Sequence, residues 1–346
     1  MRAGWFIVSA LLLASPAAGK GAPRPPSATP DGVPDLQGVW SNASLTYLTR
    51  PAGLKALVIS DAEAQALIRS NPMLKRQAEE ITPSGPPRQE SAAEGVGGYN
   101  AFWLDAGNAF GKVRGEWRTS WIVDPPSGQL PFSEQGKALV AKARTFASAA
   151  DTPTDPEKLE PWDRCLIGSR GSGGPGMLNN IYNSNYQIVQ TRDAVVIVVE
   201  MIHESRIIPL FPSKAAAEAG HRPAAIQPWL GDSVGWWEKG ALVVETTQVN
   251  REQGRAGPLY LSPAGKVTER FTRVSPTEIL YQFEVEDPTY YSQTWRAEMP
   301  LVAQKSRLFE YACHEGNYAM PDILRGARMA EHAKAGKATT GGGGGE

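Results

Sequence analysis

Residues 278–286 read Glu-Ile-Leu-Tyr-Gln-Phe-Glu-Val-Glu, and this stretch carries the clearest structural signal of the sequence. Its apolar side chains Tyr281, Phe283 and Val285 are separated by single polar residues. Successive side chains of a β-strand point to opposite faces of the sheet. The pattern therefore predicts a strand with one buried face and one polar face, as is typical of an antiparallel sheet.

The same alternation recurs on both sides of this stretch, with turn residues between the segments. The other predicted strands cover 186–190, 194–201, 236–238, 241–247, 267–274, 294–301 and 307–313. Such a series predicts an antiparallel meander, and a meander of this length has exposed edges unless it closes. The predicted fold class is mainly β: a meander closed into a lipocalin-like, calycin-type barrel or a rolled sheet, with a few peripheral helices.

Three segments instead show helical signals. Ser60 and Glu63 have the spacing of a capping box, which predicts a helix over 60–80, broken near Pro72. The segment 133–149 is also predicted to be helical. A terminal helix is expected to start at Pro321.

The N-terminus has the pattern of a secretory signal peptide. Arg2 precedes an apolar run over 5–14, and small residues follow, so we predict cleavage after Ala17 or Gly19. The apolar run is shorter than the roughly 20 residues that span a membrane. We therefore expect a periplasmic or secreted protein with no membrane contact after cleavage.

The predicted organisation has five parts. They are the signal peptide 1–19, a flexible linker 20–34, an N-terminal part 35–185 with helices and long loops packed on the sheet, the barrel core 186–320, and a terminal helix with a Gly-rich tail 321–346.

Charge and absent motifs exclude several function classes. The 346 residues include 35 Lys and Arg against 36 Asp and Glu, a net charge of −1, which argues against a nucleic-acid partner. The Gly-rich stretch 168–176 lacks the Lys-Ser/Thr of a phosphate loop, and we interpret it as a flexible loop. No Gly-x-Ser-x-Gly elbow or Cys-x-x-Cys-His haem motif occurs.

The chain has only two cysteines, Cys165 and Cys313. In an exported protein an even number of cysteines favours pairing, so we predict a Cys165–Cys313 disulfide. The alternative is a catalytic thiol at Cys313 beside His314. Neighbouring residues of a strand face opposite sides, which makes that geometry unfavourable.

Two resemblances accompany these patterns. The segment Asp35-Leu-Gln-Gly-Val-Trp40 resembles the Gly-x-Trp opening of lipocalin-type barrels, in which the Trp closes one barrel end at the first strand. The chain also resembles a widespread group of exported proteobacterial and acidobacterial proteins, a resemblance that implies export but no particular activity. The resembling stretches are 34–42, 118–126, 200–210, 229–246, 269–273 and 310–318.

Two histidines lie at the ends of predicted strands, where sites usually form. His203 and His314 are each followed by a carboxylate, Glu204 and Glu315. Imidazole titrates near neutral pH and a carboxylate can orient it. Three interpretations stay open: hydrogen-bonded rim residues without chemistry, a Zn or Fe site, and metal-free acid–base catalysis with both histidines and Glu315.

Polar neighbours extend this candidate site. Asp232 is a possible orienter of a histidine, or the cap of a turn. Arg206 would clamp a carboxylate or phenolate, or form an ion pair across the sheet. Gly316 would let the chain leave the sheet, so that Asn317 and Tyr318 turn into a cavity mouth, with Tyr318 as acid or oxyanion partner.

Aromatic residues indicate the class of ligand. Trp103, Tyr186 and Trp236 are predicted to line a cavity for a small apolar or aromatic compound. The predicted function is an exported enzyme that acts on such a compound by cofactor-independent acid–base chemistry of the lyase, hydratase or isomerase type. The alternatives are a periplasmic lipocalin-like binding protein without turnover, and a hydrolase or oxygenase with Zn or Fe on His203 and His314.

Overall fold

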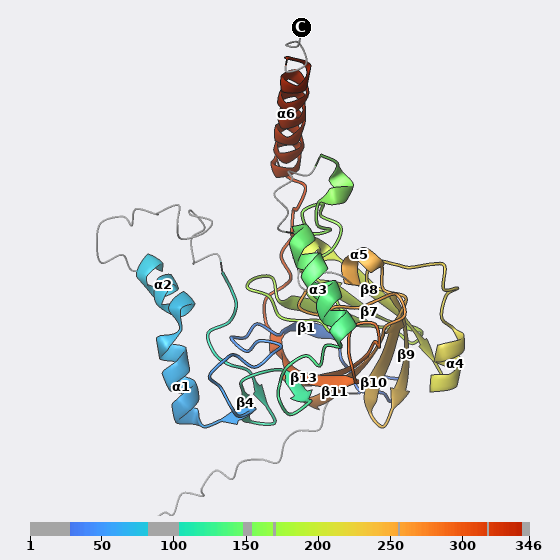
Figure 1. The fold of residues 1–346 in the computed structure, drawn as a ribbon. Coiled ribbons are helices and arrows are strands. Elements are labelled where there is room, and N and C mark those ends of the chain that lie inside the picture. Colours follow the sequence, from blue (N-terminus) through green and yellow to red (C-terminus); the bar gives the residue numbers. More distant parts are fainter. Residues whose placement is uncertain are drawn as a thin grey trace, which may run out of the picture.

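The computed structural model describes residues 28–81, 104–147, 154–168, 171–254, 257–316 and 318–340. Within them, nine strands close into a barrel in the order β1-β6-β7-β8-β9-β10-β11-β12-β13, and β13 pairs with β1 (Figure 1). The strands are β1 Gly38–Ser41, β6 Asn185–Gln190, β7 Ala194–Val199, β8 Ser205–Phe211, β9 Asp232–Glu238, β10 Ala241–Thr247, β11 Lys266–Ser275, β12 Glu278–Glu286 and β13 Trp295–Gln304. The predicted fold class, a mainly β closed barrel with peripheral helices, is confirmed.

The barrel departs from a simple meander in one pairing. β8 and β9 are parallel, with Leu210 opposite Gly235 and Phe211 opposite Trp236. Between these strands the chain runs through the helix α4, Lys214–Ala219, and a loop that returns it to the starting end. β9 therefore enters in the same direction as β8, and the expectation of antiparallel pairing throughout is wrong here.

Two further departures concern which segments become strands. The barrel takes β1 from the N-terminal part, and β5, Ile122–Asp124, adds to β13 at Arg296 and Ala297. The predicted strand 307–313 is wrong, because this segment follows β13 without strand pairing. Its residues instead lead to the disulfide and to the helix α6.

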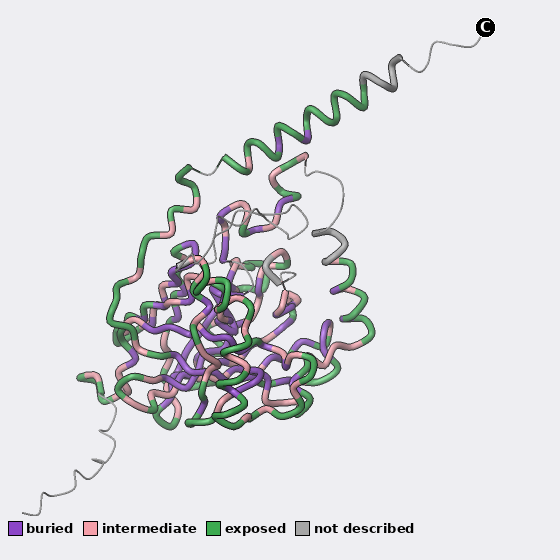
Figure 2. Tube along the Cα trace, turned by 90° about the vertical axis from the view of Figure 1, so that its left-hand side faces the viewer, coloured by how far each residue is buried: buried purple, intermediate pink, exposed green. Residues whose placement is uncertain are grey.

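Helices and a small sheet surround the barrel. They are α1 Asp61–Ser70, α2 Pro72–Ile81, α3 Glu134–Ala147, α5 Arg251–Gly254, α6 Ala319–Thr340, the short 3₁₀ turns η3 Pro156–Lys158 and η5 Met201–His203, and the sheet of β2 Val58–Ile59, β3 Lys112–Val113 and β4 Glu116–Arg118. The capping box is confirmed, because the Ser60 hydroxyl accepts from the Glu63 N–H and the Glu63 carboxylate accepts from the Ser60 N–H. Helix α6 extends away from the barrel and is exposed along most of its length (Figures 1 and 2).

The barrel strands consist largely of buried residues (Figure 2), and aromatic side chains contribute much of this core. Tyr281 lies between Phe271 and Phe283, with ring centroids 4.8 and 5.6 Å away, and Phe283 packs edge-on against Trp295 at 5.7 Å. All of these rings are buried. The interior of the barrel is therefore a packed core.

Trp40 occupies the position that the Gly-x-Trp resemblance implies. It lies on β1 and is buried, and its indole N–H donates to the Leu36 carbonyl at 2.9 Å. The Arg273 guanidinium of β11 stacks over the ring at 4.9 Å from its centroid. This cation–π contact joins β1 to β11, from which β12 and β13 separate it in the closed sheet.

The predicted disulfide is confirmed. Cys165 and Cys313 are bonded, with Cα atoms 5.9 Å apart, and the bond ties the segment after η3 to the chain beyond β13. Residues 28–34, predicted as part of a linker, fold into a turn with a bridge between Ala28 and Pro34. The predicted signal peptide lies outside the described residues. Within the described part of the chain, no helix is both long and apolar enough to cross a membrane.

Candidate functional site

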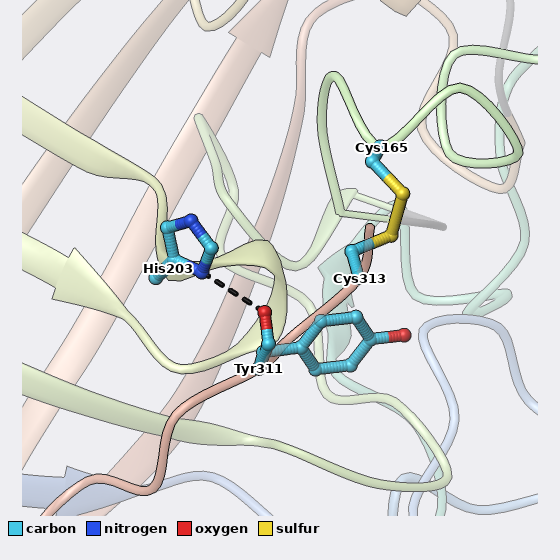
Figure 3. Close-up of a disulfide and its surroundings, with 4 residues drawn as sticks. All are labelled: Cys165, His203, Tyr311 and Cys313. Carbon is cyan, nitrogen blue, oxygen red and sulfur yellow. Dashed lines mark hydrogen bonds between the residues drawn. A yellow bond between two sulfur atoms is a disulfide. The ribbon is translucent and has the colours of Figure 1, made fainter. Parts of the chain in front are cut away.

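His203 is exposed at the end of η5 and has a left-handed backbone, with φ 44°. Its Nδ1 lies 3.0 Å from the Tyr311 carbonyl (Figure 3). A carbonyl oxygen only accepts hydrogen bonds, so Nδ1 carries the proton and Nε2 is the basic nitrogen of the neutral ring. The bond therefore fixes the tautomer of His203 and ties η5 to the chain after β13.

His314 and its neighbours lie on the surface beyond Cys313. His314, Glu315 and Tyr318 are exposed, and the Tyr318 side chain is 75% accessible. No hydrogen bond or ion pair in the described part of the chain joins His314 to His203. Two other predicted site residues, Asn317 and Trp103, lie outside the described residues. A catalytic role for His203, His314, Glu315 and Tyr318 stays a prediction.

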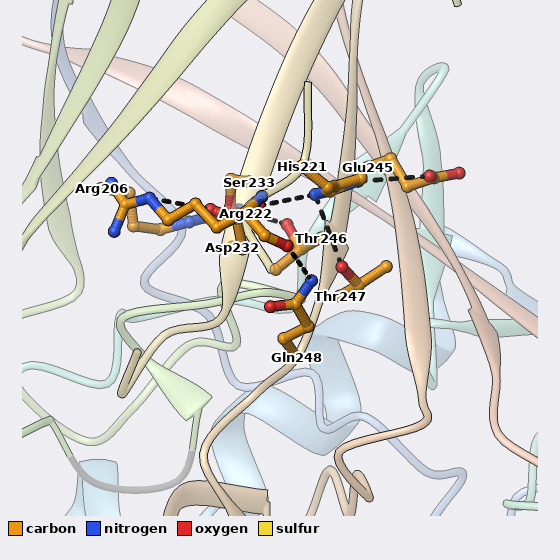
Figure 4. Close-up of polar contacts among 9 residues, drawn as sticks. All are labelled: Arg206, His221, Arg222, Asp232, Ser233, Glu245, Thr246, Thr247 and Gln248. Atoms are coloured by element: carbon orange, nitrogen blue, oxygen red, sulfur yellow. Dashed lines mark hydrogen bonds and ion pairs between the residues drawn. The ribbon is translucent and has the colours of Figure 1, made fainter. Parts of the chain in front are cut away.

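Asp232 binds a histidine that the sequence analysis did not select. Its Oδ2 lies 2.8 Å from Nδ1 of His221, and Glu245 Oε1 lies 3.4 Å from Nε2 on the other side of the ring (Figure 4). Asp232 also accepts from the Arg222 backbone N–H at 2.9 Å. The His221 side chain is only 13% exposed. Because the carboxylates contact opposite ring nitrogens, the cluster braces the loop before β9 against the barrel wall.

The pairing of β9 with β10 places these carboxylates. Asp232 lies opposite Thr247, and Glu245 lies two residues before Thr247 on the same outer face. Polar residues at alternate positions of two otherwise buried strands were the signal that marks this site in the sequence. The pattern does not predict His221, because this residue lies in a loop, eleven residues before Asp232 in the sequence.

Trp236 belongs to a small core on the outside of the barrel. It is buried and packs with Ala217 of α4 and with Val234 and Val243 of the barrel wall. The Trp236 ring packs beneath α4 and lines neither of the two cavities described below.

Arg206 and Tyr186 both point into the barrel. Arg206 forms a two-point ion pair with Glu269, with Nη1 2.9 Å from Oε1 and Nη2 on Oε2. The Tyr281 hydroxyl donates to Glu269 Oε1 at 2.6 Å, and the Tyr186 hydroxyl donates to the Ser172 carbonyl at 3.0 Å. Both ion-pair side chains are at most 1% exposed.

The ion pair explains how charges persist in this core. Burial would lower the pKa of Arg206, but Glu269 more than offsets this effect and holds the pKa above its usual value. Burial, followed by the Glu269 charge, raises the pKa of Tyr281 well above its usual value. Of the two interpretations of Arg206, the structure shows the ion pair across the sheet.

The Gly-rich stretch is a plug over this pair. Its described residues 171–176 are all buried, which corrects the interpretation as a flexible loop. A Cβ at Gly174, where φ is +91°, would lie 2.6 Å from Arg206 Nη1, and one at Gly173 would lie 2.6 Å from the Glu204 carboxylate. Glycine is needed there because the backbone passes directly over these charged groups.

Glu204 is the titratable group at the edge of the plug. Its Oε2 accepts from the Gly168 N–H at 3.2 Å. Burial raises the pKa of Glu204 from 4.5 to about 7, although the Gly168 N–H and Arg206 act in the opposite direction. This carboxyl therefore changes charge near neutral pH.

A cavity of about 570 Å³ lies beside the disulfide, and we call it the disulfide cavity. Its walls come from Leu159, Trp162 and Asp163, from Asn183, from 310–313 and from the first turns of α6. Tyr311 connects it to His203: the Tyr311 carbonyl faces the imidazole, whereas its ring extends to the other side, near Cys313 (Figure 3). Neither His203 nor His314 is among its lining residues.

A second cavity, of about 460 Å³, lies between α3, the segment 157–161, α5 and the loops at 261–263 and 289–290. It is lined by cationic and anionic residues together, including Lys142, Arg251 and Glu157.

No three His, Cys, Asp or Glu side chains of the described ranges are placed to hold a metal ion together. Comparison of the chain with protein families, curated proteins and solved structures finds no match. The function is therefore inferred from the geometry of the site.

Proposed function

We propose that this chain is an exported protein that binds a small apolar or aromatic compound in the disulfide cavity, without turnover. The observation that carries the proposal is the contrast between a barrel filled by side chains and an open cavity of about 570 Å³ outside it. Binding sites for small molecules typically have volumes of roughly 300 to 1,000 Å³ and combine apolar walls with a few polar groups. Trp162, Met320 and Asn183 supply such a lining.

Two observations support export to the periplasm or the outside of the cell. Residues 1–19 have the pattern of a signal peptide, and Cys165 and Cys313 form a disulfide, which persists in oxidising compartments. We expect the intact mass of the mature protein to correspond to a chain that begins at Ala18 or Lys20. A full-length mass in the exported fraction would contradict cleavage.

The binding proposal is tested by screening the mature protein against aromatic and terpenoid compounds by isothermal titration calorimetry. Ala312→Trp fills the disulfide cavity and should abolish binding. The matched control Lys142→Trp alters the second cavity and should leave binding unchanged. Binding that survives Ala312→Trp but disappears in Lys142→Trp would place the ligand elsewhere, and a screen without any bound compound would overturn the proposal.

Acid–base catalysis beside the same cavity is the second candidate, because His203 contacts the backbone of one of the residues that line it. His203 Nδ1 lies 3.0 Å from the carbonyl of the cavity residue Tyr311, and His314 follows the cavity residue Cys313, although neither imidazole lines the cavity itself. A compound bound there would then be the substrate of a lyase, hydratase or isomerase. His203→Ala and His314→Ala should abolish its conversion and leave its affinity unchanged. Metal analysis of protein isolated without chelators distinguishes this candidate from a Zn or Fe enzyme.

A further inference from the structure

We infer that the ligand of the disulfide cavity carries a positive charge on an apolar or aromatic body, as an amine does. This inference rests on the proposed binding function and specifies its ligand class. Three features of the cavity support it: the sign of its charges, the absence of ion pairs to its carboxylates among the described residues, and the aromatic rings beside them.

The charged residues that line the cavity are all acidic. Asp163 and Glu310 contribute carboxylates, and none of its described lining residues is Lys, Arg or His. The second cavity contains Lys142 and Arg251 beside its glutamates. The absence of lining cations is thus particular to the disulfide cavity, and it favours a cationic ligand over an anionic one.

Neither carboxylate of the cavity has a counter-charge among the described residues, although Glu310 is exposed and Asp163 accepts a hydrogen bond from the Glu160 backbone. Within the described ranges, no ion pair involves Asp163 or Glu310. Glu200, in contrast, accepts from the side chains of Asn183 at 2.9 Å and Asn185 at 3.1 Å, and from the Phe309 N–H.

Partial burial gives Asp163 a further reason to attract a cation. Burial raises the pKa of Asp163, and the hydrogen bond from the Glu160 backbone opposes this only in part. A partly buried carboxylate without a counter-charge is disfavoured, and a bound cation would relieve that cost.

Aromatic and apolar side chains accompany the carboxylates. Trp162 is 47% exposed, and Tyr311 is also in the cavity wall. The face of an indole or phenol ring attracts a cation within about 6 Å of its centroid. Leu159, Met320 and Ile323 provide the apolar surface that the body of the ligand would contact.

The test compares three compounds with one skeleton: phenylbutylamine, phenylbutanol and phenylbutanoate. Calorimetry with the mature protein should give about tenfold or tighter binding of the amine than of the alcohol, and the weakest binding for the carboxylate. Asp163→Asn and Glu310→Gln should each weaken the amine several-fold and leave the alcohol unchanged. Glu157→Gln, in the second cavity, is the matched control and should change neither.

The outcomes separate this inference from the proposed function. Equal affinity for the amine and the alcohol, both lost in Ala312→Trp, would overturn the positive charge and retain the binding site. Amine binding that is insensitive to Ala312→Trp and Trp162→Ala would overturn both. Failure of a folded protein to bind any of the three compounds, while another neutral compound binds in the cavity, would overturn the inference alone.

Discussion

The barrel interior and the disulfide cavity use the same types of residue with opposite results. In the barrel, Glu269 is paired with Arg206, bonded by Tyr281 and sealed from solvent. In the cavity, Asp163 lies beside Trp162 without an ion pair among the described residues. In the barrel the chain itself supplies the counter-charge of a fully buried carboxylate, whereas Asp163 is only partly buried and has no counter-charge among the described residues. This difference is the basis of the proposal that a cationic ligand supplies the missing charge.

Removing one member of the barrel ion pair should have the largest effect on stability. Glu269→Gln leaves Arg206 charged and buried, so we expect a loss of about 3–5 kcal/mol in the free energy of unfolding, measured with urea. Glu238→Gln is the control, because its ion pair with Arg270 is on the surface and should contribute less than about 1 kcal/mol. Similar losses of stability in both variants would show that burial does not make the Arg206–Glu269 pair more important than a surface ion pair.

Removing the disulfide should affect the cavity more than the barrel. Cys165→Ser combined with Cys313→Ser frees the segment that carries Tyr311, so we expect loss of ligand binding and about 2–5 kcal/mol of stability. The near-ultraviolet circular dichroism of the barrel aromatics should persist. Retained binding with unchanged affinity would show that the cavity does not depend on this bond.

Glu204 predicts a pH dependence of stability. The pKa of Glu204 is raised to about 7 from 4.5, so the folded state retains a proton that the unfolded state loses. Stability should therefore fall by at most about 3 kcal/mol as the pH rises from below 4.5 to above 7. Glu204→Gln should remove this slope, whereas Glu286→Gln, on the exposed side of β12, should keep it. An unchanged slope in Glu204→Gln would contradict the assignment.

A substitution in the plug should cause the smallest loss of stability. Gly174→Ala adds a methyl group 2.6 Å from Arg206 at a left-handed position and should cost about 1–3 kcal/mol, measured by urea unfolding. Gly240→Ala also has a positive φ, +77°, but meets nothing within 4 Å. Gly240→Ala therefore measures only the cost of placing an alanine at a positive φ, without a steric clash. Equal losses of unfolding free energy in the two variants would show that the close approach of residue 174 to Arg206 does not affect stability.

Much of the fold was predictable because its signals are local. Alternation over 278–286 and the neighbouring segments predicts β10 to β13, and Ser60 with Glu63 predicts the start of α1. The parallel pairing of β8 with β9 was not predictable, because alternation gives the faces of a strand but not its direction. The apolar residues of 307–313 suggested a strand, yet part of this segment lines the cavity.

The candidate site was less predictable because its contacts are non-local. Arg206 and Glu269 are 63 residues apart, and only the closed barrel brings them together. The same holds for His203 and the Tyr311 carbonyl, which the sequence separates by 108 residues. A count of two cysteines was enough to predict the disulfide, but not that Cys313 would line a cavity.

The seam between β1 and β13 has a consequence for the order of folding. Val39 pairs with Gln304, so among the nine barrel strands the one that is synthesised first closes the barrel against the one that is synthesised last. Such non-local pairing is slow, because a long loop must be ordered before the contact forms. This side of β1 therefore stays unpaired until β13 has been synthesised. The fluorescence of Trp40 should then change in the closing step, after the hairpins of β9 to β13 have formed.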